Sequence, residues 1–396
     1  MNAKIIGAAF LFILFHISAL GQNWDIEWEK KMGTQNLDVF TDVIQNNESG
    51  FTVIGTTFPE GKQDMDFWLI KFSAAGDLVW SKTMGTANND FPSSLEQCND
   101  GGYIISGKTQ VGDNIFKAFL LKTDNNGSEI WQKILEKDGW ENATNVIVTN
   151  DESFVVSGEE LTSDGNKNIW LAKLTGEGEF VWEKSYGENK AASPASLKKL
   201  PDGGFAMAGQ ISEKGSKDSD LWIFRFDKNG EKMWDTQVKS PGINMLPECI
   251  CCSPDSNIVA VGWYGTCMND LNSADPIFDY DLFITQISSK GKFLWTKNID
   301  SEGSEGGNAV VIRPDGKFLL AGKKETSYLG RIGPWLLLTD KKGTVLSELV
   351  LPFIFNGDQA AKIINTSDGG FVVIGPGDID PDKTRSDGWI KKFKAF

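Results

Sequence analysis

One stretch of the chain decides the fold, and from Asn99 to Ile134 it reads NDGGYIISGKTQVGDNIFKAFLLKTDNNGSEIWQKI. Together with the residues just before it, this stretch contains four runs of strand-forming residues: Ser93–Gln97, Tyr103–Thr109, Ala118–Thr123 and Glu129–Ile134. Turn-forming residues separate the runs, with Asn-Asp-Gly-Gly after the first, Asp-Asn after the second and Asp-Asn-Asn-Gly after the third. The pattern predicts four antiparallel strands joined by tight turns.

The same unit occurs seven times along the chain. The residues that open its second strand are Phe51, Tyr103, Phe154, Phe205, Ile258, Phe318 and Phe371, at spacings of 52, 51, 51, 53, 60 and 53 residues. A glycine stands four residues after each of them, at Gly55, Gly107, Gly158, Gly209, Gly262, Gly322 and Gly375. Four strands per repeat, seven times over, is typical of a β-propeller. The predicted fold class is therefore all-β, a seven-bladed β-propeller with four antiparallel strands per blade.

Two further columns of the alignment explain the high tryptophan content. One column is Trp68, Phe119, Trp170, Trp222, Phe283, Trp335 and Trp389, and the other is Trp28, Trp80, Trp131, Trp182, Trp234, Trp295 and Leu346. Together they hold 11 of the 14 tryptophans, so we interpret them as packing residues that each blade repeats. Trp24, Trp140 and Trp263 lie outside both columns.

The two ends of the chain are predicted to share one blade. The last repeat stops at Phe396 without its fourth strand, whereas Ile26–Gly33 matches Leu78–Gly85, a fourth strand of the first repeat. The N-terminal segment should therefore complete the seventh blade as its outermost strand and close the ring. We expect one domain from residue 22 to residue 396, with repeats near 34–85, 86–136, 137–187, 188–239, 240–300, 301–350, and 351–396 plus 24–33.

The register of these repeats resembles exported bacterial propeller proteins of a kind common in Bacteroidota. Those proteins are built from Asp-Gly-Gly-Tyr/Phe, Asp-x-Trp-Leu-x-Lys and Asp-x-x-Gly-x-x-x-Trp-x-Lys-x-x-Gly segments, and here Asp100–Tyr103 and Asp66–Lys71 carry the first two. The resemblance covers nearly all of residues 24–396. These exported propellers are in turn similar to the quinoprotein-like and galactose-oxidase/kelch-like propellers. It implies the architecture, but such propellers have many different activities.

Residues 1–21 are predicted to be a secretory signal peptide, cleaved near Gly21. Lys4 precedes an apolar run that ends at Leu20, with small residues at the cleavage point. The alternative is a retained N-terminal anchor helix. Loss of Lys4 changes the formal charge from −15 to −16, and such an acidic protein repels nucleic acid and anionic membrane surfaces. We expect a secreted or periplasmic monomer, with no nucleic-acid partner and no membrane insertion.

The only histidine is His16, inside the predicted signal peptide. The mature chain therefore cannot form a Ser-His-Asp triad, a His-ligated zinc site or the copper site of galactose oxidase. Five cysteines, three of them at Cys249, Cys251 and Cys252, do not form a regular disulfide framework. The vicinal pair Cys251-Cys252 is a feature of quinone-dependent dehydrogenases. We favour buried thiols or a local disulfide to Cys267.

One column of acidic residues lies at the entry to the innermost strands: Asp38, Asp90, Glu141, Glu305 and Asp358, with Ala192 and Met245 in the other two repeats. Propeller geometry would place these carboxylates around the mouth of the central channel. They would then raise one another's pKa or attract a cation such as Ca²⁺. Apart from such a cation, we expect no cofactor. The alternative is that each carboxylate accepts hydrogen bonds from the backbone of its own loop.

The largest departure from the repeat is an insertion in the fifth unit, between Trp263 and Asp281, on the same face as the acidic column. Aromatic rings beside carboxylates suit sugars, whose apolar faces stack and whose hydroxyls form hydrogen bonds. We predict a ligand-binding surface that consists of Trp140, Trp263, Tyr264, Asp275, Asp279 and Tyr280. The alternative is a lid that packs on its own hydrophobic side chains.

Two functions are favoured after these exclusions, ahead of a quinone or metal oxidoreductase. The first is a non-catalytic exported binding or scaffolding propeller whose channel face presents a surface to a glycan, a peptide or a partner protein. The second is a carbohydrate-active enzyme, a hydrolase or a lyase, that uses carboxylate or Tyr side chains without His. No catalytic residue stands out from the many Asp-x-x-Gly turns.

Overall fold

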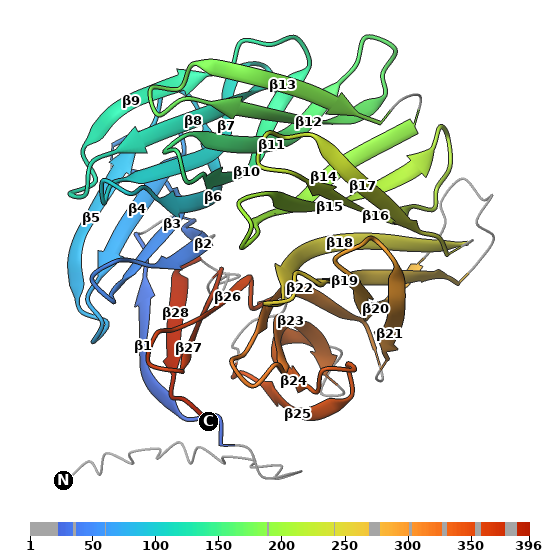
Figure 1. Cartoon of the computed structure of the whole chain (residues 1–396). Coiled ribbons are helices and arrows are strands. Elements are labelled where there is room, and N and C mark those ends of the chain that lie inside the picture. The colour runs from blue at the N-terminus through green and yellow to red at the C-terminus, as the bar shows by residue number, and fades with distance from the viewer. Residues whose placement is uncertain are drawn as a thin grey trace, which may run out of the picture.

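A computed structural model describes residues 23–34, 37–59, 61–187, 190–240, 242–268, 278–300, 303–326, 331–352, 358–376 and 386–396. This part of the chain forms 28 strands in seven four-stranded sheets, arranged as blades around a central axis (Figure 1). The blades, numbered 1 to 7, are β2–β5 (Val39–Gln45, Phe51–Thr57, Asp66–Phe72, Leu78–Met84), β6–β9 (Asp90–Gln97, Tyr103–Gly112, Ile115–Thr123, Glu129–Ile134), β10–β13 (Trp140–Val148, Phe154–Leu161, Lys167–Leu174, Phe180–Tyr186), β14–β17 (Lys190–Lys199, Phe205–Glu213, Asp220–Phe226, Lys232–Val238), β18–β21 (Ile243–Cys252, Ile258–Cys267, Phe278–Ile287, Phe293–Ile299), β22–β25 (Glu305–Ile312, Phe318–Thr326, Arg331–Thr339, Val345–Val350), and β26–β28 with β1 (Lys362–Asn365, Phe371–Gly375, Gly388–Phe393, Ile26–Met32). The predicted seven-bladed propeller is confirmed.

The seventh blade is built from both ends of the chain, as the sequence predicts. Its strand order is β1-β28-β27-β26, and β1 pairs antiparallel with β28 from Ile26↔Phe393 to Met32↔Gly388. In Figure 1 the blue strand β1 lies beside the red strand β28. Two ion pairs join these strands: Lys391 Nζ lies 2.6 Å from Glu29 Oε2, and Lys392 pairs with Glu27. The N-terminal strand therefore closes the ring.

The hydrophobic core lies between neighbouring blades. The second and third strands of a blade are buried along most of their length, whereas the outermost strand exposes alternate residues. One cluster joins Ile54, Phe67 and Leu69 of blade 1 to Tyr103 and Phe119 of blade 2. Each interface repeats this arrangement, so every blade depends on both of its neighbours for burial.

Tryptophans of the outermost strands fasten each blade to the next. The Trp131 indole of blade 2 lies under the β12–β13 turn of blade 3, and its Nε1 donates to Gly176 O at 3.2 Å. Trp234 Nε1 donates in the same way to Ser289 O at 3.1 Å, and Trp28 Nε1 to Ala74 O at 3.2 Å. The turn glycine above the ring, Gly178 in blade 3, has a positive φ of 80°, which glycine adopts without strain. This confirms the interpretation of the column as repeated packing.

The interface between blades 6 and 7 uses a different tryptophan. Blade 6 has Leu346 where the other blades have Trp. Trp24, which precedes β1 of blade 7, packs against the hydrophobic core that blades 6 and 7 share. Its Nε1 donates to Ser347 Oγ at 3.0 Å, and its ring lies edge-on to Phe396 at 5.3 Å. Trp24 therefore supplies the aromatic ring that the repeat lacks at this position, which the alignment of single columns could not show.

The glycine column is explained by a β-bulge in the innermost strands of blades 1 to 6. In blade 6 the register of β22 shifts between Gly307 and Ala309, which brings the carbonyl oxygen of Gly306 against Gly322. A Cβ added at Gly322 would lie 1.9 Å from that oxygen. The same contact recurs at Gly158, where Asn142 O would lie at 1.9 Å. Only glycine therefore fits beside the bulged strand.

We expect Gly322→Ala to lower the free energy of unfolding by about 1–3 kcal/mol or more, because backbone atoms must move to admit the methyl group. The matched control is Gly112→Ala, where the nearest atom, Ile115 Cδ1, would lie 3.4 Å from the new Cβ. Urea unfolding curves of the two variants measure the difference. Equal midpoints would contradict this account of the glycine column.

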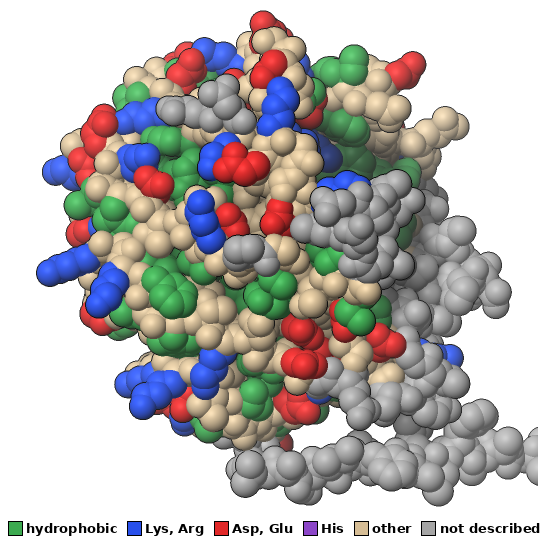
Figure 2. Space-filling model, turned by 90° about the vertical axis from the view of Figure 1, so that its right-hand side faces the viewer, with side chains coloured by type: hydrophobic (Ala, Val, Ile, Leu, Met, Phe, Trp, Pro, Cys, Tyr) green, Lys and Arg blue, Asp and Glu red, His purple; other side chains and the backbone are tan. Residues whose placement is uncertain are grey.

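A repeated ion pair lies within most blades. A basic residue of the third strand bonds to an acidic residue in the turn between the first and second strands. The pairs are Lys71–Glu48 at 2.9 Å, Lys122–Asp100 at 3.1 Å, Lys173–Asp151 at 2.7 Å, Lys392–Asp368 at 2.6 Å, and Arg225–Asp202. Charges of both signs are also interspersed over the side of the ring that Figure 2 shows. These ion pairs thus stabilise individual carboxylates within a chain of high net negative charge.

These pairs predict loss of stability in acid. Hydrogen bonds from Lys173 and Thr149 lower the pKa of Asp151 to about 2. Burial acts in the opposite direction on Asp368, but bonds from Lys392 and Thr366 still bring its pKa to about 2. Because these folded-state pKa values lie below the ordinary value of 3.8, the stabilisation is fully present above about pH 4. It should be lost as the pH falls through 2.

Urea unfolding between pH 7 and pH 2.5 tests this prediction. Lys173→Met should lower stability at pH 7 and flatten its decline below pH 4, whereas Lys228→Met, at an exposed turn, should change neither. If the free energy of unfolding fell equally with pH in the wild type and in the Lys173→Met variant, the Lys173–Asp151 pair would not account for the loss of stability in acid.

Candidate functional site

The blades present two different faces. One face, which we call the upper face, carries two kinds of connection. The first kind leads into an innermost strand, as residues 85–90 do, and the second joins the second strand to the third, as residues 112–115 do. The lower face carries the remaining turns, such as residues 98–102 and 124–128. Apart from Asp275, which lies outside the described residues, the residues predicted to bind a ligand or a metal lie at or near the upper-face ends of the strands.

The acidic column has a local structural role in the first two blades. Asp38 accepts hydrogen bonds from the backbone N–H and hydroxyl of Thr34 and from the Thr57 hydroxyl, and it is fully buried. Asp90 is also fully buried and accepts from the Thr86 N–H at 2.5 Å. Burial raises the pKa of Asp90, and bonds from Thr109 and Thr86 oppose the shift. Asp38 and Asp90 therefore fit the alternative in which each carboxylate accepts hydrogen bonds from its own loop.

The other three members of the column lie in different surroundings. Glu305 is buried, Asp358 accepts from the Gln359 N–H and the Trp389 indole, and Glu141 is half-buried. In the residues that the structure describes, no three His, Cys, Asp or Glu side chains come together as a group that could hold a metal ion. The predicted Ca²⁺ site at this column stays a prediction without a geometry that supports it.

The structure places Trp140 mainly in the core, although it also lines a surface pocket with Glu160 and Glu183. Only 5% of its surface is exposed, and it belongs to the core between blades 2 and 3. Its ring stacks on Trp170 with centroids 4.0 Å apart and an interplanar angle of 2°. Phe180 lies edge-on to it at 5.9 Å. Trp140 is thus an additional core residue, although it is absent from the repeated columns.

The remaining predicted residues of blade 5 do gather on the upper face. Trp263 and Tyr280 lie edge-to-face at 6.0 Å, and the Tyr280 hydroxyl accepts from Asn244 Nδ2 at 3.3 Å. Tyr264 is half-buried against the core, and Asp279 is exposed. Asp275 lies outside the described residues, as does the rest of 269–277. The described part is a small aromatic cluster beside one carboxylate.

Carboxylates crowd the base of this cluster. Burial, and then the neighbouring Asp300 and Asp279, raise the pKa of Asp281 to about 6. Asp281 is therefore mostly ionised at pH 7 and takes up a proton as the pH falls through about 6.

Apart from Trp263, sequence reasoning missed a ring of residues that directly follow the glycine column. The ring, which we call the upper ring, consists of Thr56, Lys108, Glu159, Gln210, Trp263, Lys323 and Pro376. All seven are half-buried. Several contact the next blade: Glu159 accepts from Ser193 Oγ at 2.6 Å, and the Trp263 indole covers Gly306. These equivalent positions hold residues of almost every chemical type, unlike the packing columns.

Two charged residues, Lys323 of the upper ring and Glu248 of β18, lie beside each other at blades 5 and 6. Lys323 Nζ lies 4.2 Å from the centre of the Trp263 indole ring, a cation–π contact. Glu248, the bulged residue of β18, is exposed to solvent on the inner strand, but the surrounding protein raises its pKa to about 7 by desolvation, with Lys323 opposing the shift. Glu248 and Lys323 are some 75 residues apart in sequence, so no local motif indicates their proximity.

A pocket of about 230 Å³ opens on the upper face between blades 2, 3 and 4. Two of its residues, Lys108 and Glu159, belong to the upper ring. Glu141 of the acidic column lies in the same wall. This is where a predicted site residue and the upper ring meet.

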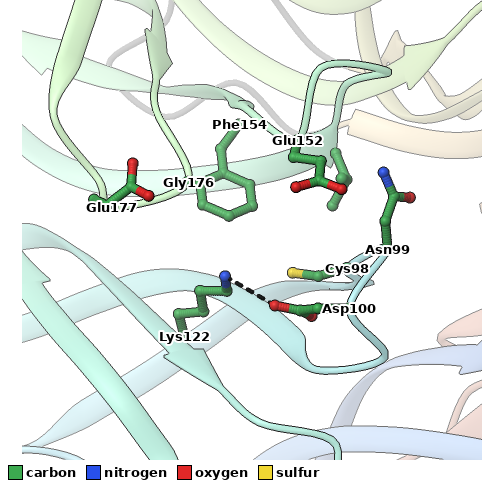
Figure 3. Close-up of a pocket in the computed structure, with 9 residues that line it drawn as sticks. Cys98, Asn99, Asp100, Lys122, Glu152, Phe154, Gly176 and Glu177 are labelled. Carbon is green, nitrogen blue, oxygen red and sulfur yellow. Dashed lines mark ion pairs between the residues drawn. The ribbon is translucent and has the colours of Figure 1, made fainter.

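A second pocket, on the lower face between blades 2 and 3, is much smaller at about 80 Å³ (Figure 3). Lys122 points toward Asp100 across its mouth, with Nζ 3.1 Å from Oδ2, and the Phe154 ring forms one wall. Burial raises the pKa of the Cys98 thiol in this pocket to about 12, so the thiol is neutral and unreactive. The space fits a few water molecules, whose share of liquid volume is about 30 Å³ each.

The cysteine cluster lies on the innermost strand of blade 5. Cys249, Cys251 and Cys252 are free thiols in β18, so the predicted alternative of a disulfide from this cluster to Cys267 is wrong. Burial, followed by the neighbouring thiols, raises the pKa of Cys251 well above its ordinary value. These side chains therefore act as small apolar groups, which was the other alternative.

Comparison with known proteins supports the fold and little else. No family model matches the chain. Among curated proteins, the regulatory protein FlaEY of Caulobacter vibrioides is 22% identical over 275 residues, which make up 63% of this chain and 28% of FlaEY. The chain thus matches less than a third of the length of that relative.

Solved structures similar to this chain include proteins of very different kinds. The Pan2 WD40 domain of Neurospora crassa matches with a TM-score of 0.51 at 10% identity, covering 89% of this chain and 88% of that domain. The GH93 α-L-arabinofuranosidase of Fusarium graminearum, solved with arabinobiose, matches with a TM-score of 0.53 at 14% identity, covering 76% and 92%. At these identities the similarity shows a shared propeller fold. Among the described residues no helix is long and apolar enough to cross a membrane.

Proposed function

We propose that this protein is an exported binding propeller that captures a glycan or a peptide segment of a partner on its upper face. The upper ring is the observation that carries the proposal. The other columns repeat one residue type because each blade needs the same packing, ion pair or close contact. The upper ring instead places an ammonium, a carboxylate, an amide and an indole at equivalent, half-buried positions. Packing alone does not require such variety, whereas recognition of an asymmetric ligand does.

The location proposal rests on the predicted signal peptide, residues 1–21, which lie outside the described residues. The mature chain would be secreted or periplasmic. Its charge of −16 favours a neutral or cationic ligand over a polyanion such as nucleic acid. Ca²⁺ could bridge an anionic ligand to the exposed carboxylates, and we expect no other cofactor.

A matched pair of variants tests the proposed face. The upper variant combines Lys108→Ala, Gln210→Ala and Lys323→Ala, and the lower variant combines Asn125→Ala, Lys228→Ala and Lys290→Ala at exposed turns. Both are compared with the wild type on arabinan, xylan, galactan and laminarin, and on a random peptide library. Arabinan is included because a propeller of similar fold was solved with arabinobiose. We expect at least one probe to bind, and the upper variant to lose tenfold or more of that affinity. Loss in the lower variant instead would refute the proposal.

A carbohydrate-active enzyme is the second candidate, and one observation favours it. Glu141 and Glu159 line the same pocket, and two carboxylates in one pocket are the minimum for acid–base cleavage of a glycosidic bond. The same polysaccharide panel separates the two functions when product release is followed by reducing-end assay. Turnover that disappears in Glu141→Gln would support the enzyme, and binding without turnover would support the binding propeller.

A further inference from the structure

We infer that the pocket between blades 2, 3 and 4 is a subsite for a single neutral sugar ring. This inference rests on the proposed binding function and names the ligand class and the residues that recognise it. The pocket combines an apolar wall, hydrogen-bonding groups and balanced charges in a space of limited size. Each of these three properties excludes a class of ligand.

The size of the pocket excludes large ligands. Its volume is about 230 Å³, below the range of roughly 300–1,000 Å³ that drug-sized ligands occupy. The opening lies on the upper face, so a longer chain can continue across the surface while one unit enters. The pocket therefore suits one monosaccharide unit of a glycan.

The walls match the two faces of a sugar ring. Phe116 from β8 and Pro194 from β14 provide apolar surface on which C–H groups can pack. Asn142 and Thr144 from β10 add an amide and a hydroxyl to the same lining. Asn142 Oδ1 accepts from Ser93 Oγ at 3.4 Å, which orients the amide. A purely apolar ligand would leave these polar groups without partners and would bind poorly.

The charges of the pocket balance. Its lining carries the carboxylates of Glu141 and Glu159 and the ammonium of Lys108, and Lys167 Nζ lies 2.6 Å from Glu159 Oε1. An anionic sugar would meet the Glu141 carboxylate, and a cationic one would meet Lys108. A neutral ligand with many hydroxyl groups can instead donate to the carboxylates and accept from the ammonium.

Two of the charged groups, Lys108 and Glu159, are held in place before any ligand arrives. Lys108 Nζ lies 4.6 Å from the Phe116 ring centre and 5.5 Å from that of Phe91, and the two rings meet edge-on at 6.0 Å. Glu159 is fixed by Lys167 and by Ser193 Oγ at 2.6 Å. Such preorganisation reduces the entropy lost when a ligand binds.

The test uses the methyl glycosides of glucose, galactose, mannose, xylose and arabinose, with methyl glucuronide and methyl glucosaminide as charged comparators. Titration followed by NMR measures binding to the folded mature chain. We expect at least one neutral glycoside to bind, and Phe116→Ala and Glu141→Gln each to weaken it by tenfold or more. Glu141→Gln is nearly isosteric at a half-buried position, so it tests recognition without a packing defect.

Control variants carry the same changes away from the pocket. Phe293→Ala removes a phenyl ring from the outermost strand of blade 5, and Glu231→Gln neutralises an exposed carboxylate of a lower-face turn. Neither should change the affinity. The inference is overturned if no neutral glycoside binds, if the glucuronide or the glucosaminide binds more tightly, or if Phe116→Ala and Glu141→Gln bind as the wild type does.

The outcomes also separate this inference from the proposed function. A polysaccharide or peptide that the upper variant loses but Glu141→Gln and Phe116→Ala retain would leave the binding propeller standing and remove the sugar subsite. Retention of every probe by all the upper-face variants would refute both.

Discussion

Deletion of residues 23–33 is expected to prevent the propeller from folding to a closed ring. The deletion removes β1, which pairs with β28 from Ile26↔Phe393 to Met32↔Gly388 and leaves an open strand edge behind. It also removes Trp28 from beneath Gly76, and Trp24 from the interface between blades 6 and 7. Full burial of one Trp is worth at most about 4–6 kcal/mol at about 25 cal/mol per Å². Half-buried rings contribute part of that value.

The combined loss of the β1 pairing and of the two Trp rings is large compared with the total stability of a typical domain, about 5–15 kcal/mol. The truncated mature chain should aggregate or melt far below the wild type in a thermal scan monitored by circular dichroism and light scattering. A melting temperature unchanged by the deletion would show that the strand does not hold the ring together.

A segment exchange is the matched control for the deletion. Replacement of residues 23–33 by a copy of residues 75–85, the equivalent strand of blade 1, restores the strand and a Trp in place of Trp28. It places glycine where Trp24 stands, so stability should return only in part. Restoration of Trp24 within the exchanged segment should recover most of the remainder. Failure of both exchanges would mean that pairing and the two rings do not account for closure.

The architecture could be predicted from the sequence because each column performs one repeated physical task. The glycines avoid the carbonyl of a bulged strand, the outer tryptophans fasten one blade to the next, and the third-strand lysines bond to turn carboxylates. A task repeated seven times leaves a pattern that survives wide variation elsewhere. The chain ends were predictable for the same reason, since Trp28 matches the fourth-strand tryptophans.

The candidate site was predictable only in part, because it depends on contacts between blades. Lys108 and Glu141 line one pocket although they come from blades 2 and 3, and Glu248 lies near Lys323 of the following blade. No spacing within one repeat indicates such contacts. The sequence argument also treated departure from the repeat as a sign of exposure, and Trp140 shows that a residue outside the columns can fill the core.

Trp140→Ala is therefore expected to cost about 3–5 kcal/mol of the free energy of unfolding, as truncation of a buried aromatic residue does. The change removes a ring that is 95% buried and stacked on Trp170, and it leaves a cavity between blades 2 and 3 that the rigid sheets cannot close. Trp263→Ala is the comparison, because Trp263 is half-buried and contacts Lys323 and Tyr280 at the surface. It should cost clearly less, since water already reaches part of its ring.

Urea unfolding of the two variants, followed by circular dichroism, measures this difference directly. The two changes should also separate in binding: Trp263→Ala alters the upper ring and should weaken any ligand that spans it, whereas Trp140→Ala should leave the affinity of the folded fraction unchanged. A Trp140→Ala variant as stable as the wild type would mean that its stacking on Trp170 contributes nothing to the interface. A Trp263→Ala variant that unfolds as early as Trp140→Ala would make Trp263 a core residue. The upper ring would then lose its one aromatic member as a ligand contact.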